Sequence, residues 1–187
     1  MTKVDYEVWL KPDANPLGTS PETMKLLRST DRAKALERDD CQRGVFEEEM
    51  ERTEVLVCAI DSNGHDVVGV SCLMKMGAYR KYDLQNLSGV PYPVSADYEL
   101  GYKMVAPTHR GKGISTAIVG FMLGYAKGKS WSLVATTHMS NSASVHTLSK
   151  MGFRFTWRSK PWRSENDEAA ARHELVCLME WIPGRDN

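Results

Sequence analysis

The feature that most constrains this chain is a strand, a basic turn and a helix that follow one another in the middle of the sequence. The apolar, aromatic run at 98–105 is typical of a strand, and Pro107, which has no N–H for a sheet ladder, predicts its end. The turn 110–113 reads Arg-Gly-Lys-Gly. A helix is expected from Ile114 on, because apolar residues then recur at helical spacing. The predicted buried face of this helix consists of Ile114, Ala117, Ile118, Phe121, Met122 and Tyr125.

This order of elements predicts a binding site for a phosphate or pyrophosphate group. The first N–H groups of a helix have no partner inside the helix, and the helix dipole places partial positive charge at the same end. Glycine lets a ligand approach the backbone closely. Arg110 and Lys112 add positive charge to the turn.

Two common phosphate-binding motifs fit the turn poorly. The dinucleotide motif Gly-x-Gly-x-x-Gly matches Gly111 and Gly113, but Thr116 occupies the third glycine position. A Gly-Lys-Ser triplet further on could close a P-loop, but Leu123 stands where its first glycine belongs, and a helix precedes it. The turn is instead similar to the Arg/Gln-x-x-Gly-x-Gly/Ala motif of the GNAT superfamily of acyl-CoA-dependent N-acetyltransferases, with Ser115 at the last small position.

A second segment strengthens this resemblance. Residues 141–153 begin with Asn141 and end in Lys-Met-Gly-Phe, and the family's next helix is similarly opened by asparagine and closed by Lys-x-Gly-Phe. Asparagine is a good helix N-cap and glycine a good residue just beyond a helix end, so physical chemistry predicts the same boundaries. The resemblance covers residues 53–182. It implies an α/β fold in one domain, residues 1–187, with a mixed, mostly antiparallel sheet flanked by helices on both faces.

The rest of the chain predicts the other elements of such a fold. Strands are expected at residues 4–10, 54–60, 67–75, 131–139, 153–160 and 174–182. Asn63-Gly64 predicts a hairpin between the second and third of these. Helices are expected near 19–28, with Pro21 at the first helical position, and from Asp31 to about Arg52.

Two stretches leave alternatives open. The second predicted helix is strongly acidic over residues 37–52, which favours a solvated helix face, with a rim that attracts a cationic acceptor as the alternative. Residues 76–97 predict a long irregular loop that contains three tyrosines. These tyrosines either line an acceptor pocket, as the resemblance implies, or pack the loop onto the core.

Composition argues against several classes of function. Lys and Arg together number 24, as do Asp and Glu, so the zero net charge gives no electrostatic basis for binding nucleic acid. The four cysteines form no Cys-x-x-Cys pair and the five histidines show no metal-ligand spacing, so neither a metal site nor a disulfide framework is expected. No signal peptide is apparent, and no apolar run approaches the roughly 20 residues that span a bilayer. A cytoplasmic protein that binds no membrane is therefore expected.

The resemblance also implies an activity, which is direct transfer of an acetyl group from acetyl-CoA to a primary amine. The residues expected to bind acetyl-CoA are Met104, Val105, Arg110, Gly111, Lys112, Gly113, Ile114, Ser115, Asn141 and Ser144. In the family, the strand before the turn diverges from the next strand and admits the pantetheine arm. The acceptor is a small molecule or a protein amino group that the sequence does not identify, and a homodimer is left open.

Glu99 is the first candidate for the general base. It lies eleven residues before Arg110, an offset that matches the catalytic glutamate of some family members. A carboxylate whose pKa is raised by burial could take the amine proton near neutral pH, directly or through water. Asp97 and His138 are alternatives, and a structural role for Glu99 at the strand edge also remains open.

The chain departs from the family at the general acid. Many members place a tyrosine seven residues after the asparagine that opens the second helix, but Leu148 occupies this position here. Leucine donates no proton, so we expect solvent or a serine such as Ser144 to protonate the CoA thiolate. The competing hypothesis is a non-catalytic CoA-binding or regulatory module.

Overall fold

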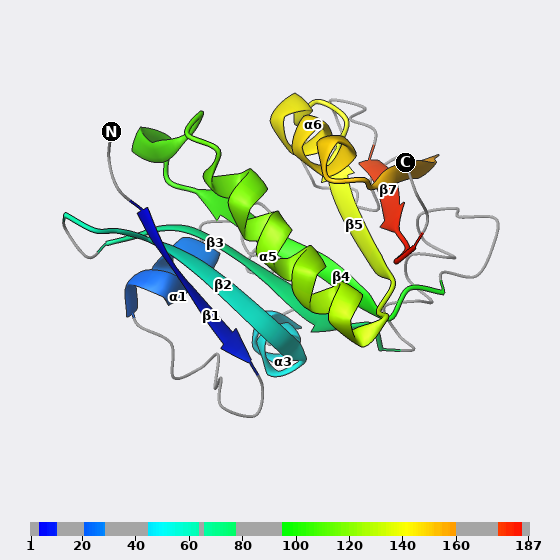
Figure 1. Ribbon diagram of the computed structural model, residues 1–187, viewed down its shortest axis with the longest axis horizontal. Coiled ribbons are helices and arrows are strands. Elements are labelled where there is room, and N and C mark those ends of the chain that lie inside the picture. The colour runs from blue at the N-terminus through cyan, green and yellow to red at the C-terminus, as the bar shows by residue number, and fades with distance from the viewer. Residues whose placement is uncertain are drawn as a thin grey trace. The chain divides into compact units, whose positions relative to one another are not determined.

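The computed structural model describes residues 4–10, 21–28, 45–63, 66–77, 95–159 and 176–184, and the strands among them form one sheet (Figure 1). The strands are β1 (Val4–Leu10), β2 (Thr53–Asp61), β3 (Val67–Lys75), β4 (Tyr98–Val105), β5 (Leu133–His138), β6 (Arg154–Ser159) and β7 (Val176–Trp181). Their order across the sheet is β1-β2-β3-β4-β5-β7-β6. The β4–β5 pair is parallel, whereas β1–β2, β2–β3, β5–β7 and β6–β7 are antiparallel. The predicted mixed, mostly antiparallel sheet is therefore confirmed.

In the described residues, α-helices occur where the sequence predicts them, and a 3-10 turn that it did not predict follows β4. They are α1 (Pro21–Arg28), α3 (Val45–Glu51), the 3-10 turn η4 (Pro107–His109), α5 (Ile114–Lys129) and α6 (Ser142–Lys150). Each predicted strand is also present, with ends that differ by a few residues. The first part of the predicted acidic helix and most of the predicted loop at 76–97 lie outside the described residues.

The chain divides into two compact units. The first consists of Met1–Lys75 with Leu100–Tyr125, and the second of Met76–Glu99 with Ala126–Asn187. The boundary passes through β4 after Glu99 and through α5 after Tyr125. Both elements therefore contribute residues to each unit.

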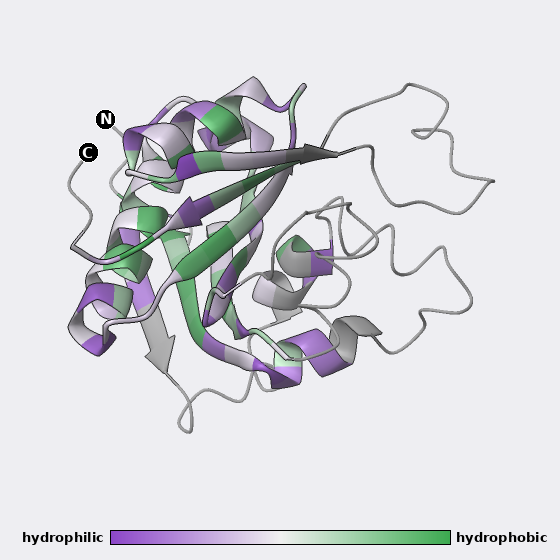
Figure 2. Cartoon of the chain, turned by 90° about the vertical axis from the view of Figure 1, so that its right-hand side faces the viewer, coloured by the Kyte–Doolittle hydropathy of each residue, from purple (hydrophilic) through white to green (hydrophobic). Residues whose placement is uncertain are grey.

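In the first unit, helices cover both faces of the strands. A core cluster on one face contains Met50 of α3, Tyr102 of β4 and side chains of β2 and β3. Thr23 of α1 reaches Cys58 of this cluster, with 3.8 Å between Oγ1 and Sγ. The other face carries α5, because a Cβ at Gly69 of β3 would lie 2.8 Å from Cγ2 of Ile114. Figure 2 shows that hydrophobic residues gather along strands of the sheet.

In the second unit, a smaller core holds Met76, Ala96, Val134 and Leu178, with Trp157 packed against it. The rings of Tyr98 and Trp131 stack beside the start of β4, with centroids 3.9 Å apart. The last two predicted strands are present as β6 and β7, which pair with each other antiparallel.

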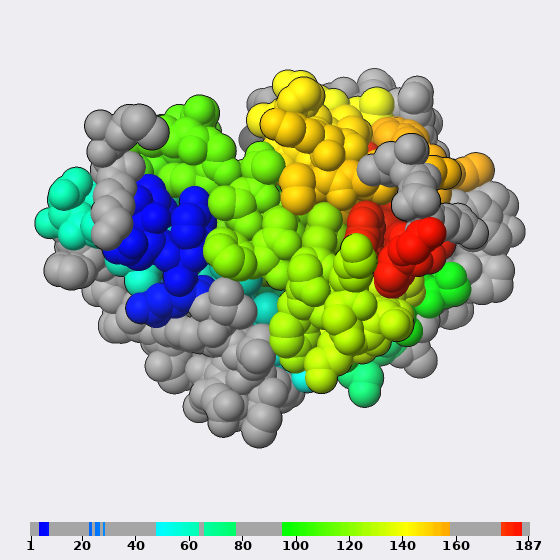
Figure 3. All heavy atoms as spheres, viewed as in Figure 1, coloured from blue at the N-terminus to red at the C-terminus, as the bar shows by residue number. Residues whose placement is uncertain are grey.

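The predicted buried face of α5 is wrong at Phe121, whose side chain is 46% exposed. Phe121 instead packs against Tyr6 of β1, with ring centroids 5.3 Å apart, and β1 and α5 lie side by side on the surface (Figure 3). Val119 and Ala126, outside the predicted face, are fully buried. Ile114, Ile118 and Met122 of the predicted face are buried, but because α5 is apolar around most of its circumference, spacing alone did not define the limits of its buried side.

Candidate acyl-CoA site

The turn between β4 and α5 is built around two glycines in the left-handed conformation. Gly111 has a φ of 75° and Gly113 a φ of 79°, values that residues with a side chain rarely adopt. A Cβ at either position would meet no atom within 4 Å, so the space around both is open. The N–H of Ala117 donates to the carbonyl of Gly113 at 3.0 Å, and the earlier N–H groups of α5 have no partner within the helix. The geometry is suited to an anion.

The predicted cationic and backbone ligands adjoin this turn. Arg110 Nε donates to the carbonyl of Val105 at 3.1 Å, which ties the guanidinium to the end of β4 and leaves its other N–H donors for a ligand. Lys112 is exposed. Met104 is half-buried against the core, and Ile114 is buried and anchors the start of α5. The structure therefore brings together the predicted residues of the strand end, the turn and the first turn of the helix.

A side-chain pair that the sequence did not predict supports the turn from the β2–β3 hairpin. His109 Nε2 lies 3.2 Å from Asp61 Oδ2, and His109 Nδ1 lies 3.0 Å from Thr108 Oγ1. The Asp61 carboxylate also accepts from the N–H of Asn63 at 3.0 Å. The hydrogen bond from Asn63, followed by the hydrogen bond and charge of His109 and the charge of Lys112, lowers the pKa of Asp61.

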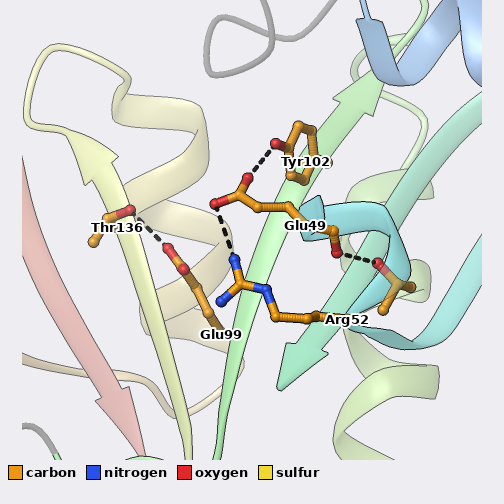
Figure 4. Close-up of polar contacts among 6 residues, drawn as sticks. Glu49, Arg52, Glu99, Tyr102 and Thr136 are labelled. Carbon is orange, nitrogen blue, oxygen red and sulfur yellow. Dashed lines mark hydrogen bonds and ion pairs between the residues drawn. The ribbon is translucent and has the colours of Figure 1, made fainter. Parts of the chain in front are cut away.

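The strand that leads to the turn contains a local distortion at Tyr102. This residue has a φ of 51° and is buried. Its hydroxyl donates to Glu49 of α3, and the Glu49 carboxylate lies 3.8 Å from Arg52 (Figure 4). Glu49 is only 3% exposed, so the predicted solvated acidic face is wrong at this position, although Glu48 and Glu51 are exposed as predicted. The sequence does not show which acidic side chain of such a helix is buried.

Glu99, the predicted base, is only 2% exposed and lies on β4 within the second unit. It is opposite Val134 in the parallel register of β4 and β5. Thr136 Oγ1 donates to its Oε1 at 3.3 Å (Figure 4). This contact fixes a carboxylate oxygen, as expected for a positioned base and equally for a structural side chain. The role of Glu99 stays a prediction.

The two alternative bases lie in different surroundings. The exposed Asp97 accepts hydrogen bonds from both the N–H and the hydroxyl of Ser132, each at 2.8 Å. Through these contacts, the Asp97 carboxylate fixes Ser132, which directly precedes β5. His138 is partly buried at the end of β5, opposite Val176 of β7.

Comparison with known proteins identifies the family. The family model for an acetyltransferase (GNAT) domain matches residues 7–154, which is most of the chain. The chain belongs to the GNAT acetyltransferase family. No curated protein matches its sequence.

Solved GNAT structures share this fold at low sequence identity. Arabidopsis thaliana NAA60 in complex with a bisubstrate analogue has a TM-score of 0.64 and 14% identity, covering 98% of this chain and 100% of that one. An acetyltransferase of Bacillus subtilis in complex with CoA has a TM-score of 0.63 and 17% identity, covering 96% and 99%. An IAA acetyltransferase from Bacillus cereus has a TM-score of 0.58 and 16% identity, covering 96% and 99%.

The second GNAT segment folds as predicted. Asn141 caps α6, and its Oδ1 accepts from the N–H of Ser144 at 3.1 Å. Gly152 has a φ of 87°, and the N–H of Phe153 donates to the carbonyl of Leu148 at 3.0 Å. Leu148 is only 1% exposed, so the position that holds a tyrosine in many GNAT proteins is part of the core here. Whether Asn141 and Ser144 bind CoA stays a prediction.

Neither a metal-binding cluster nor a membrane-spanning helix occurs in the described part of this GNAT chain. Among the described residues, no group of three or more His, Cys, Asp or Glu side chains is placed to hold a metal ion. None of the helices that the structure describes has the length and hydrophobicity needed to cross a bilayer.

Proposed function

We propose that this GNAT protein transfers an acetyl group from acetyl-CoA to a primary amine by direct attack of the amine on the thioester. The observation that carries the proposal is the turn at Gly111 and Gly113, with its positive φ angles, open surroundings and adjoining Arg110. Two solved GNAT structures with this fold are complexes with acetyl-CoA or CoA. The acceptor is a small molecule or a protein amino group, and the proposed location is the cytoplasm.

Binding falls to the turn and the adjoining strand end. The N–H groups of the first turn of α5 donate to the diphosphate, and the side chains of Arg110 and Lys112 add charge-assisted contacts. The N–H groups of Met104 and Val105 would hold the pantetheine arm, with Asn141 and Ser144 as further contacts. The predicted divergence of β4 from β5 is part of this proposal.

The chemistry requires two proton transfers. The amine nitrogen attacks the thioester carbonyl in its neutral form and gives a proton to Glu99 as the carbon–nitrogen bond forms, and the carbon–sulfur bond then breaks to leave the amide and the CoA thiolate. The leaving CoA thiolate takes a proton from solvent or from Ser144. A free thiol has a pKa near that of cysteine, about 8.5, so the thiolate leaves without a dedicated acid.

The proposal is tested by combining a binding and a turnover measurement. Titration calorimetry with acetyl-CoA measures affinity for the wild type and for Arg110→Ala, with the exposed Lys127→Ala at the far end of α5 as the matched control. Loss of a charged hydrogen bond costs about 1.5–3 kcal/mol, so Arg110→Ala should weaken binding at least ten-fold while the control stays unchanged. Equal affinity in all three proteins would refute the assigned site.

Turnover separates the enzyme from a binding module. CoA thiol release is followed on a panel of small amines, amino acids and protein substrates. Acetyl-CoA binding without release on any acceptor would favour the non-catalytic module, which Leu148 makes the main competing hypothesis. Because Leu148 is buried, a tyrosine placed there needs room in the core, and its folding must be verified before its activity is interpreted.

A further inference from the structure

Lys103, near the end of β4, has a buried amino group that nothing in the described chain binds. Its Nζ atom is buried and has no hydrogen-bond partner among the described residues. Burial lowers the pKa of Lys103 to about 8. Burying an ammonium group without a partner is costly, so an unpartnered lysine amino group in a core calls for a missing acceptor.

The neighbouring residues define the side of the sheet on which Lys103 lies. Tyr102 belongs to the core cluster that α1 and α3 cover, and Met104 packs against the same cluster. Because successive side chains of a strand point to opposite faces, Lys103 between them projects to the other face. That face carries α5, whose Ile114 packs over Gly69. Lys103 and the glycine turn at the start of α5 therefore belong to the same side of the first unit.

Lys103 is also close to the turn along the strand. It lies two positions before Val105, which corresponds to roughly 6.6 Å along a strand. The carbonyl of Val105 accepts the hydrogen bond from Arg110. A ligand that leaves the turn and follows the end of β4 passes within reach of a lysine side chain at this position. The turn binds the negatively charged group of such a ligand. Lys103 would therefore contact the segment of the ligand that extends from this group along β4.

We propose that the Lys103 amino group donates a hydrogen bond to an amide carbonyl of the pantetheine arm. This inference rests on the proposed function, because acetyl-CoA is the ligand that supplies both a diphosphate for the turn and amide carbonyls beyond it. A carbonyl oxygen is a good acceptor for an ammonium group and would satisfy the amino group in its buried position. Lys103 then contributes to acetyl-CoA affinity through the arm and leaves recognition of the nucleotide to the turn.

The test compares CoA with 3′-phospho-ADP, which retains the nucleotide and diphosphate of CoA but lacks the arm. Titration calorimetry measures both ligands on the wild type, Lys103→Met and Lys103→Arg, with Lys112→Met in the turn and the exposed Lys127→Met on α5 as controls. Lys103→Met should weaken CoA binding roughly ten-fold or more and leave 3′-phospho-ADP unchanged. Lys103→Arg keeps a donor and should retain more of the affinity, Lys112→Met should weaken both ligands, and Lys127→Met neither.

The outcomes separate this inference from the proposed function. If the wild type binds CoA and Lys103→Met binds it equally well, or loses both ligands to the same extent, the assignment of Lys103 to the arm is overturned and the proposed function stands. If the wild type binds neither ligand, the proposed function fails and the inference fails with it. Melting curves establish whether each variant is folded. If Lys103→Met does not fold, Lys103→Arg takes its place in the comparison of the two ligands.

Discussion

Glu99 is the residue on which the proposed chemistry depends most. Its carboxylate is buried and receives a hydrogen bond from Thr136. Glu99→Gln keeps the shape and an acceptor oxygen but cannot take a proton, so the turnover rate should fall roughly 10²–10⁴-fold. The fall in rate of the wild type toward acidic pH should flatten in the variant. Near-full activity with an unchanged pH profile, on an acceptor that the wild type uses, would return Glu99 to a structural role.

Asp61 links the β2–β3 hairpin to the glycine turn and should make stability depend on pH. The N–H of Asn63 and, next, His109 lower its pKa below the ordinary value of 3.8 in the folded state. A lowered folded-state pKa stabilises the protein above pH 3.8 and loses that contribution as the pH falls through the folded-state pKa. Asp61→Asn should therefore be less stable than the wild type at pH 6, and the difference should shrink below pH 3.8.

Urea denaturation at pH 6 and at pH 3 measures this difference, with the exposed Asp66→Asn in the same hairpin as the control. A gap between Asp61→Asn and the wild type that is the same at both pH values would contradict the linkage.

The sequence could predict some of these residues and not others, for a physical reason. Gly111 and Gly113 were found because a turn that holds an anion needs glycine, and their positive φ angles agree with that reasoning. The contacts of Asp61 with His109 and of Glu49 with Tyr102 join residues about 50 positions apart in the chain. Nothing local in the sequence marks such pairs, because the fold alone brings their partners together.

At the scale of elements, the contact between β3 and α5 depends on the absence of one side chain. A Cβ at Gly69 would lie 2.8 Å from Ile114 Cγ2 and 3.1 Å from Ile118 Cδ1. Gly69→Ala should therefore force the helix or its side chains to shift and should lower the free energy of unfolding by about 1–3 kcal/mol. The displaced residues start α5, so acetyl-CoA affinity should fall as well.

Gly124, on the exposed side of α5, is the matched control. A Cβ there meets no atom within 4 Å, and alanine is a better helix former than glycine. Gly124→Ala should raise the free energy of unfolding by about 0.5–1 kcal/mol, so the same substitution has opposite signs at the two glycines. Chemical denaturation measures both. Equal stability of Gly69→Ala and the wild type would mean that α5 does not pack on β3 as described.

Element types followed from the sequence more readily than packing faces. Strands β2 and β3 were predicted from their apolar runs and the Asn63-Gly64 turn signal, and α6 from its cap and its closing glycine. These signals are local, since they depend on residues close together in the chain. The buried side of α5 was predicted correctly at Ile114, Ile118 and Met122 but not at Phe121, which packs against Tyr6, because a helix that is apolar on most sides is oriented by its neighbours.

At the scale of the whole molecule, the prediction that the chain is one domain implies that it unfolds cooperatively. The two compact units share β4 and α5, because each element continues from one unit into the other. Separate unfolding of one unit would have to interrupt a strand after Glu99 and a helix after Tyr125. We therefore expect one calorimetric transition, with equal calorimetric and van't Hoff enthalpies.

Acetyl-CoA should raise the temperature of that single transition. A ligand at about 100 times its dissociation constant stabilises the native state by about 2.7 kcal/mol, which corresponds to roughly 5–10 °C for a chain of this size. The glycine turn lies in the first unit, whereas Glu99 and α6 lie in the second. If the units unfold together, differential scanning calorimetry should show a single peak that moves up as acetyl-CoA is added. Two peaks, of which only one moves, would mean that the units fold independently and that ligand binding stabilises one of them alone.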